Sequence, residues 1–502
     1  MRHLAPWLAL LVIGCGKADD TGSVAPATDS EAVVEGDESH DEPSAEVNPH
    51  EPLDTDSFVD PKECAACHPT QYEQWETSMH RYAPLSPVFD AMAAKAFRDT
   101  AGEVGTFCTG CHSPIGTYEG EEGWTVAADR SAKSKEGVSC DYCHSVTNHT
   151  GILGNGNLEA APSGVKYGSF ESNYMGAHTT EKSDFIQSPE MCGSCHDVFM
   201  FPGIQIEQAY TEYAESPAAA EGVRCQDCHM GSEPGVVSER PIGPAAIVDG
   251  EPGPDRVLSN HSFVGPDYAL IDTFPYEDDL EASAAAQAEY MTRVQTLMEN
   301  AAELGDLDVM FEEDADGGAI MVSVRSLTAG HRIPTGFTSE RQMWVAVTVE
   351  NRDGDVVWST GDLDEQGDLR DEHSWAVKSG EVALDTSLVN FQSKNVTAWR
   401  PWNEAGVFTS GEEDIEVGGA GGTFLSIFPF DALAVVRNSI EPLEERELVY
   451  SFEGVGIEDV GRVDVALYYR NLPPYLLRAL QLDDLVERLH VITIDTAEIV
   501  FE

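Results

Sequence analysis

Basic residues are scarce in this chain of 502 residues. Only 29 Lys and Arg stand against 89 Asp and Glu, which gives a formal net charge of -60. Such a charge argues against nucleic acid and anionic surfaces as partners, because both would repel the chain. Basic proteins, cationic surfaces or metal cations fit the charge better. An alternative explanation is that the charge only keeps a surface protein soluble in salt.

The N-terminal apolar stretch, residues 4–13, is short. A transmembrane helix needs roughly 20 apolar residues, so this stretch does not predict one. The stretch follows a basic start and precedes Cys15, a pattern that resembles a bacterial lipoprotein signal peptide. We expect residues 1–15 to be that signal, with lipidation at Cys15; an ordinary secretory signal is the alternative. Both predict export, and Gly16 in place of the Asp of inner-membrane retention signals favours an outer-membrane lipid anchor, facing the periplasm or the cell surface.

Cysteine is nearly absent outside one repeated pattern. Ten of the eleven cysteines lie in five copies of Cys-x-x-Cys-His, at residues 64–68, 108–112, 140–144, 192–196 and 225–229. This spacing is typical of covalent c-type haem attachment, in which both thiols form thioethers and the histidine becomes an axial iron ligand. The predicted attachment residues are Cys64, Cys67, His68, Cys108, Cys111, His112, Cys140, Cys143, His144, Cys192, Cys195, His196, Cys225, Cys228 and His229. The sequence therefore predicts five covalently bound haem c groups.

Zinc sites and disulfides are the two alternatives for these cysteines. A structural zinc site usually takes two Cys-x-x-Cys pairs, and five pairs do not divide into such sites. Zinc also gives no reason for a histidine directly after every second cysteine. Structural disulfides join cysteines far apart in sequence and do not repeat a three-residue spacing. Both alternatives explain the pattern less well than haem.

Each haem iron also needs a sixth ligand or keeps an open position. Seven histidines lie outside the motifs and the N-terminal 60 residues. Five of them are the predicted distal iron ligands, namely His80, His149, His178, His261 and His331. His373, among acidic residues, and His490, at the start of a strand pattern, are expected to be structural. Two axial nitrogens on one iron stand about 4 Å apart, so His80, about 18 Å from His68 along a helix, must serve a different haem.

Composition divides the chain into segments. Residues 18–60 carry fourteen Asp and Glu and no Lys or Arg, so residues 16–60 are predicted to be a disordered acidic tether. All five motifs fall within 61–277, where we expect short helices and loops wrapped around the haems. Residues 278–305 predict one connecting amphipathic helix that ends at Gly305.

The remaining segment, 306–502, changes to an alternating apolar pattern. Runs such as 321–325, 343–350, 463–469 and 491–494 predict strands, and residues 351–354 predict a turn between strands. One helix, from Pro474 to about Leu489, is expected to interrupt them. The predicted fold class is therefore α+β: a haem-packed, mostly helix and loop cytochrome domain followed by a β-sandwich-like C-terminal domain.

Several segments together resemble bacterial multihaem c-type cytochromes. The segments are 64–80 with Trp75, 167–197, 212–230 and 261–265. That broad family is related to the tetrahaem cytochrome of ammonia oxidation and to the pentahaem nitrite reductases. Residues 330–336 and 469–480 resemble the β-rich C-terminal portion of many of its members. The resemblance covers about residues 60 to 490. It implies closely stacked, bis-histidine, low-potential haems, with His80, His178, His261 and His331 at the positions of the family's distal ligands.

The function predicted from the sequence is electron transfer by an exported, lipid-anchored pentahaem cytochrome. Its expected partners are redox donor and acceptor proteins, including basic proteins or other multihaem cytochromes, and the membrane through the lipid anchor, but not nucleic acid. The alternative is a multihaem redox enzyme of nitrogen-oxide or hydroxylamine chemistry, with one iron left open. All five motifs here end in histidine, whereas the active haem of pentahaem nitrite reductases commonly has lysine, which counts against that alternative.

Overall fold

The computed structural model describes residues 56–171, 176–200, 203–311, 317–398, 423–454 and 456–501. The predicted signal peptide 1–15, its Cys15, and residues 16–55 of the predicted tether lie outside the described residues. The side chains of Phe58 and Val59 are only 1% and 3% exposed. Phe58 and Val59 are therefore packed against the rest of the protein, although the sequence pattern placed them in the tether.

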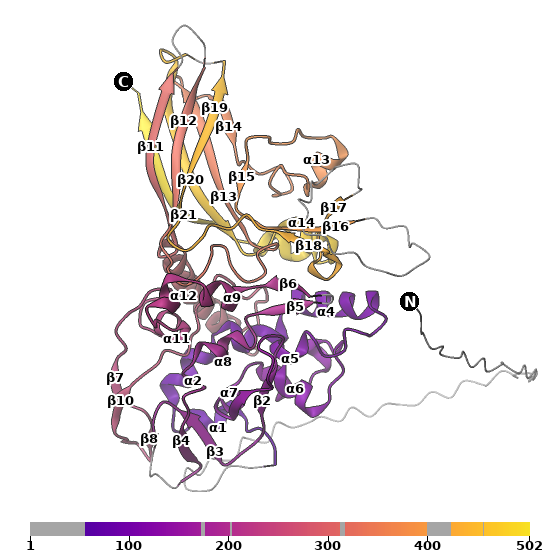
Figure 1. The fold of residues 1–502 in the computed structure, drawn as a ribbon, viewed down its shortest axis with the longest axis vertical. Coiled ribbons are helices and arrows are strands. Elements are labelled where there is room, and N and C mark those ends of the chain that lie inside the picture. The colour runs from indigo at the N-terminus through magenta and orange to yellow at the C-terminus, as the bar shows by residue number, and fades with distance from the viewer. Residues whose placement is uncertain are drawn as a thin grey trace, which may run out of the picture. The chain divides into compact units, whose positions relative to one another are not determined.

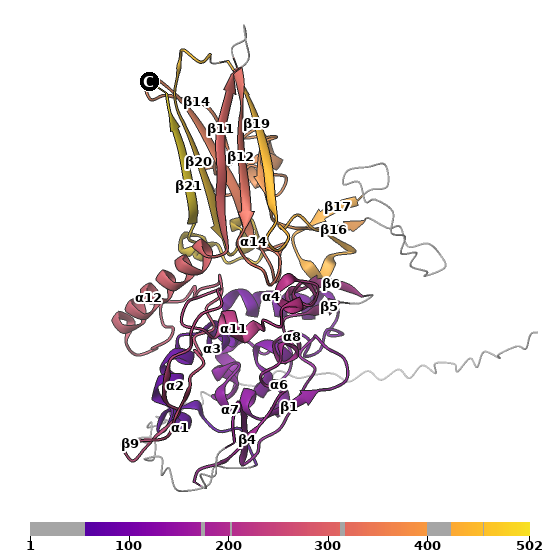
Figure 2. The same ribbon diagram turned by 60° about the vertical axis from the view of Figure 1, so that its left-hand side comes forward.

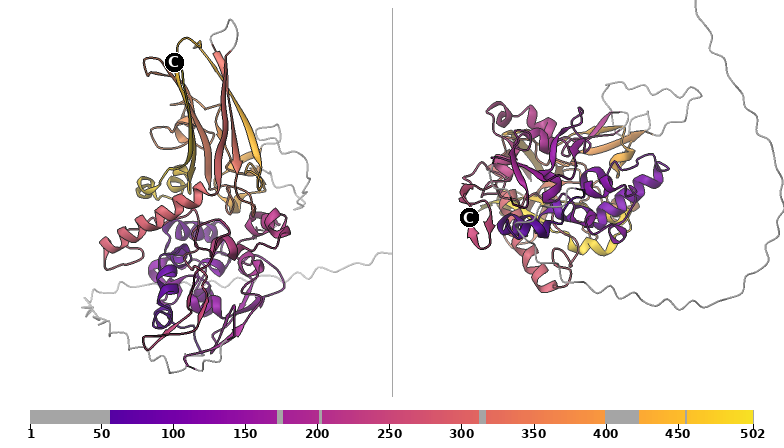
Figure 3. Two further views of the ribbon diagram at one scale, coloured as in Figure 1. Left: turned by 90° about the vertical axis from the view of Figure 1, so that its left-hand side faces the viewer. Right: turned by 90° about the horizontal axis from the view of Figure 1, so that it is seen from below.

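Short helices and connecting loops form the segment that carries the five motifs (Figure 1). The helices are α1 (Pro61–Ala65), α2 (Pro69–Glu76), α3 (Met79–Tyr82), α4 (Pro87–Asp99), α5 (Thr109–His112), α6 (Pro114–Glu119), α7 (Cys140–His144), α8 (Pro189–Gly193), α9 (Ala209–Ala214), α10 (Pro217–Ala220) and α11 (Cys225–His229). Proline occupies the first helical position of several of them, where its missing N–H costs no hydrogen bond. In Figure 3 the indigo and magenta part of the ribbon shows this winding of short elements.

Short paired strands lie between these helices. They are β1 (Val146–His149), β2 (Leu158–Ala160), β3 (Val165–Gly168), β4 (Thr179–Lys182), β5 (Val198–Met200), β6 (Ile204–Glu207), β7 (Ile242–Pro244), β8 (Ile247–Val248), β9 (Glu251–Pro252) and β10 (Asp255–Val257). They form two-stranded units, β1 with β2, β3 with β4, β5 with β6, β8 with β9, and β10 with β7. Such small units supply local anchoring but little apolar core.

A helix of 20 residues, α12 (Leu280–Glu299), leads into the strand-rich part of the chain (Figure 2). Asp279 caps the N-terminus of this helix, because its side chain accepts a hydrogen bond from the backbone N–H of Ala282. The helix ends before the predicted stop at Gly305. Gly305 instead lies within β11 (Ala302–Phe311), where the pairing with the next strand shifts register between Leu304 and Leu307. A Cβ at Gly305 would lie 2.0 Å from the Ser323 hydroxyl, which explains the glycine at this irregularity.

The C-terminal strands make two antiparallel sheets. One has the order β11-β12-β19, and the other β14-β13-β20-β21 with β15 paired to β13. The strands are β12 (Gly317–Ser326), β13 (Gln342–Asn351), β14 (Val356–Thr360), β15 (Val389–Asn390), β19 (Glu445–Glu453), β20 (Val460–Arg470) and β21 (Ile492–Val500). A third, smaller sheet joins β17 (Thr423–Ser426), β16 (Lys394–Ala398) and β18 (Ala434–Val436).

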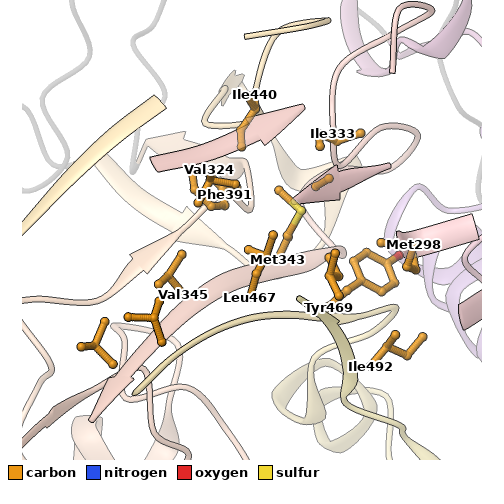
Figure 4. Close-up of a cluster of buried hydrophobic side chains, with 14 of the residues drawn as sticks. Met298, Val324, Ile333, Met343, Val345, Phe391, Ile440, Leu467, Tyr469 and Ile492 are labelled. Atoms are coloured by element: carbon orange, nitrogen blue, oxygen red, sulfur yellow. The ribbon is translucent and has the colours of Figure 1, made fainter. Parts of the chain in front are cut away.

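One apolar core joins the inward faces of the two larger sheets. It includes Ile320 on β12, Val345 on β13, Tyr450 on β19 and Leu467 on β20, none more than 2% exposed. Figure 4 shows Met343, Val345, Leu467 and Tyr469 beside one another in this core. In β20 the alternation that predicted the strand is the alternation of buried and more exposed side chains, whereas at the start of β13 consecutive residues are buried, among them Trp344. The prediction of a fold with both helices and strands is confirmed at this level.

Two short helices accompany the sheets, α13 (Trp375–Ser379) and α14 (Pro474–Ala479). The helix predicted from Pro474 to about Leu489 is interrupted, because Gln481 takes a positive φ of 63° and a separate 3-10 helix follows at Asp483–Arg488. Of the helices in the described ranges, none combines the length and apolar composition needed to cross a membrane. The described residues belong to one compact unit, and the segment boundaries at 278 and 306 stay predictions.

Candidate haem-binding site

Each of the five motifs occupies about one turn of helix, in or just after a short helix. In α7 (Cys140–His144) and α11 (Cys225–His229) the motif is the whole helix. Cysteines three residues apart on a helix lie on the same face, so both thiols can reach one porphyrin edge. All ten motif cysteines are free thiols, not disulfides. The motif cysteines are thus all available for covalent attachment.

Four motif histidines face a histidine from elsewhere in the chain. The ring centroids are 6.3 Å apart for His68 and His178, and 6.2 Å apart for His80 and His196. They are 6.3 Å apart for His144 and His261, and 6.2 Å apart for His229 and His331. The structure thus brings four of the predicted distal ligands, His80, His178, His261 and His331, to four different motifs.

The spacing of these pairs matches the space that an iron ion requires. Two imidazole nitrogens on one metal stand about 4 Å apart, at about 2 Å per bond, and each ring centroid lies about 1 Å behind its nitrogen. The expected separation of centroids is therefore about 6 Å, and the observed values are 6.2 to 6.3 Å. Imidazoles in direct stacking contact would lie closer together. The residues present fit four bis-histidine haem irons.

Hydrogen bonds orient several of these rings. The Nδ1 atom of His68 lies 2.8 Å from the carbonyl oxygen of Ala245, and that of His144 lies 2.6 Å from the carbonyl oxygen of Tyr167. On the distal side, His261 and His331 make the same contact with the carbonyls of Ser259 and Arg332, both at 2.9 Å. A carbonyl can only accept, so Nδ1 carries the proton and Nε2 is left to bind a metal.

Burial keeps most of these imidazoles neutral. It lowers the pKa of His80 to about 3, and the pKa values of His229 and His261 to about 4. The physical cause is the loss of hydration of the charged imidazolium. Neutral imidazole is the form that ligates iron, so the environment favours the ligating state at neutral pH.

His196 differs from the other ligands in its partner. Its Nδ1 lies 3.2 Å from the carboxylate oxygen Oε1 of Glu207, at the end of β6. Burial acts to lower the pKa of His196, but the hydrogen bond and the charge of Glu207 outweigh it, and the pKa is raised. No sequence motif pointed to Glu207, because its role depends on the pairing of β5 with β6, which places it opposite Val198.

His112, the histidine of the second motif, has a different neighbour. Its ring stacks on Phe89 of α4, with centroids 4.2 Å apart and the planes inclined by 10°. Burial lowers the pKa of His112 to about 4, so it too is neutral. Within the described part of the chain, the ring that contacts His112 is this phenyl ring and not a second imidazole. The second motif, 108–112, therefore has a motif histidine without a second imidazole facing it.

His149, the fifth predicted distal ligand, does not face a motif histidine. It ends β1, where it pairs with Leu158 of β2, and its ring lies 6.1 Å from that of Phe185. Its Nδ1 accepts a hydrogen bond from the backbone N–H of Gly151, only two residues away. The position does not support the distal role predicted for His149. The sequence offered five histidines for five irons, but in the hairpin of β1 and β2 the His149 ring lies beside Phe185 and not beside a motif histidine.

The motifs approach one another through their cysteines. Thiols of different motifs lie close enough to raise one another's pKa: Cys140 raises the pKa of Cys64, Cys195 that of Cys111, and Cys225 that of Cys192. Each contact joins two different motifs. Groups attached to these sulfurs would therefore lie close to one another, and the contacts link motif 64–68 with 140–144, 108–112 with 192–196, and 192–196 with 225–229.

The apolar core around the motifs is small for the length of chain involved. Besides residues that join the large sheet core, the buried cluster here consists of Phe58, Ile115, Tyr142 and Val146. A segment of this length would normally need a much larger core to fold. Bound macrocycles would provide the missing apolar interior.

Comparison with known proteins agrees with this geometry. Residues 63–145 match the family described as cytochrome c554 and c-prime. Among solved structures, the chain is similar in fold to a penta-heme cytochrome c552 from Thermochromatium tepidum, with a TM-score of 0.54 and 18% identity, over 88% of this chain and 99% of that chain. No curated protein matches the sequence significantly. Covalently bound haem c is the cofactor that these similarities support, and they confirm the resemblance of this chain to the multihaem c-type cytochromes.

Proposed function

We propose that this chain is an exported, lipid-anchored pentahaem c-type cytochrome that transfers electrons through low-potential, mainly bis-histidine haems. The four imidazole pairs with centroids 6.2 to 6.3 Å apart are the observation that carries the proposal. They give each of four motifs a pair of imidazole nitrogens as candidate ligands. Imidazole at both axial positions favours lower potentials than a methionine and histidine pair, because thioether ligation raises the potential.

The chain itself sets the arrangement of the redox centres. Bound haem supplies one-electron chemistry, and electrons pass between neighbouring macrocycles. The thiol contacts Cys64 to Cys140, Cys111 to Cys195 and Cys192 to Cys225 support close stacking of the attached groups. The motif 192–196 takes part in two of these contacts. We therefore place it at a junction between the motifs 108–112 and 225–229.

Location and partners follow from charge and from the N-terminal sequence. The lipobox-like Cys15 supports an outer-membrane anchor, on the periplasmic or cell-surface side, and haem attachment outside the cytoplasm fits an exported chain. The net charge of -60 favours basic redox proteins or other multihaem cytochromes as donor and acceptor, and it disfavours nucleic acid.

The test of this function begins with the purified protein. We expect its mass to exceed that of the polypeptide by five haems, and a haemochrome assay to give five haems per chain. Electron paramagnetic resonance (EPR) of the oxidised protein should show four low-spin ferric centres. A protein that carries no covalent haem, or in which most centres are high-spin, would contradict the proposal. Labelling with a radioactive fatty acid, lost on Cys15→Ser, tests the anchor separately.

The second candidate is the multihaem redox enzyme, and His112 is the observation in its favour. A motif histidine without an imidazole opposite leaves one iron position for a small ligand. We expect one high-spin ferric centre in addition to the four low-spin ones. Turnover of hydroxylamine or nitric oxide that Phe89→Ala alters, with the low-spin signals unchanged, would favour the enzyme. Binding of cyanide without any turnover would favour the carrier.

A further inference from the structure

The proximal histidine of the fourth motif is held by a carboxylate, whereas others are held by backbone carbonyls. His68 and His144 donate from Nδ1 to the carbonyls of Ala245 and Tyr167, at 2.8 and 2.6 Å. His196 instead has Oε1 of Glu207 at 3.2 Å from Nδ1. A carboxylate that accepts this proton gives the ring more imidazolate character and raises its basicity as a ligand.

The position of Glu207 is fixed by the local fold. Glu207 pairs with Val198 across the hairpin of β5 and β6, and Val198 is two residues after His196. The Glu207 residue is 8% exposed, so little water competes for the carboxylate. The nearby cation Arg341 is paired with Asp267, with 2.7 Å between Nη2 and Oδ2. The charge of Arg341 still acts on Glu207, but the hydrogen bond of the carboxylate goes to His196.

A stronger anionic ligand stabilises ferric over ferrous iron and lowers the reduction potential. We propose that Glu207 makes the centre held by His196 and His80 the lowest-potential centre of this chain and the last to accept an electron. This inference rests on the proposed haem function. Because Cys195 and Cys192 contact Cys111 and Cys225, that centre also lies at the junction of two others. Glu207 would then act through the His196 ring, and the low potential would shorten the time that an electron spends at this junction.

The matched variants are Glu207→Gln and Glu190→Gln. The first replaces the carboxylate with an uncharged amide of the same shape. Glu190 lies in α8, close to the same motif, and accepts a hydrogen bond from the Tyr210 hydroxyl at 3.4 Å instead of contacting the imidazole. Both variants remove one negative charge near the same motif, and the hydrogen bond to the His196 ring belongs to Glu207. The charge of Glu207 also acts on His112, so the signal of the His112 centre is followed in the same titration.

The measurement is a stepwise reductive titration followed by EPR. His80→Ala first identifies the low-spin signal of this centre, because that signal should convert to high spin. In the unaltered protein we expect the signal to disappear last. In Glu207→Gln it should disappear earlier, at a less negative potential, and its g-values should shift; in Glu190→Gln the order of reduction should be kept.

Three results would overturn the inference. They are an unchanged order of reduction in Glu207→Gln, an equal shift in both variants, and a wild-type protein in which another centre is reduced last. Haem content of all variants is checked by haemochrome assay. If the protein holds no haem at these motifs, or if His80→Ala changes no low-spin signal, the proposed function or its ligand assignment fails first. Failure of the proposed function can therefore be told apart from failure of the inference on Glu207, because the haem assay and the His80→Ala spectrum come before any potential is measured.

Discussion

The rings of His229 and His331 lie 6.2 Å apart and are inclined by only 16°, although they come from opposite halves of the chain. His229 belongs to a motif, and His331 belongs to the loop between β12 and β13, which lie in different sheets. The loop is held by Glu212, whose carboxylate accepts hydrogen bonds from the Thr335 hydroxyl at 2.6 Å and the Arg332 backbone N–H at 3.2 Å. The β-rich part therefore contributes the imidazole that faces this motif histidine.

Replacing His331 tests this connection. We expect His331→Ala to convert one low-spin ferric centre to high spin, because the iron at His229 would lose its second imidazole. The measurement is the number of high-spin and low-spin centres per molecule in the EPR spectrum. His490→Ala is the control, since the His490 ring packs on Tyr268 at 5.1 Å. An unchanged spectrum in His331→Ala would remove it from the ligand set.

Replacing His149 tests the ligand that the hairpin turns away. We expect His149→Ala to leave the spin states unchanged, because the ring contacts Phe185 and the Gly151 backbone. His178→Ala, in which His68 loses its partner, should convert one centre to high spin and serves as the positive control. A new high-spin signal in His149→Ala would show that the histidine count was correct and that this hairpin rearranges when haem binds.

A buried carboxylate makes stability depend on pH. Burial raises the pKa of Glu340 from 4.5 to about 7. Between these values the folded state binds the proton more tightly than the unfolded chain does, so the free energy of unfolding falls as pH rises through that window and is level above it. We expect Glu340→Gln to remove this decrease and to stabilise the protein at pH 8 by on the order of 1–3 kcal/mol.

Urea unfolding followed by circular dichroism at pH 5 and pH 8 measures this effect. Glu447→Gln, at an exposed position of β19, is the control and should change neither value. Equal stability differences between wild type and Glu340→Gln at the two pH values would contradict the assignment of the pH dependence to Glu340.

The core between the sheets should respond to the loss of side-chain volume. Leu467 on β20 is fully buried. Its replacement by alanine leaves a cavity, so we expect Leu467→Ala to lower the free energy of unfolding by about 2–5 kcal/mol. Leu443→Ala makes the same chemical change at a side chain that is 54% exposed and should have a much smaller effect. Similar losses in the two variants, measured by urea unfolding, would place the core elsewhere.

The sequence was most informative where chemistry depends on short spacing or strict alternation. Cysteines three residues apart followed by histidine predict an attachment site without knowledge of the fold, since one helical turn brings them together. The alternation in 343–350 and 463–469 likewise predicted β13 and β20, because side chains on a strand point alternately to core and solvent. The helix end predicted at Gly305 was wrong, because the helix ends at Glu299 and Gly305 lies at an irregularity of β11. Glycine is favoured at both kinds of position.

Only the tertiary structure decided which histidine opposes which motif. The residue type made His149 and His331 equal candidates, but a ligand must reach the far face of a ring held by a distant segment. The strand pairing turned His149 toward Phe185, and the loop held by Glu212 brought His331 to His229. The contact of Glu207 with His196 likewise depends on the pairing of β5 with β6. The residues for covalent attachment can be recognised within five residues of sequence, whereas the facing imidazole and its electrostatic surroundings depend on the packing of distant segments.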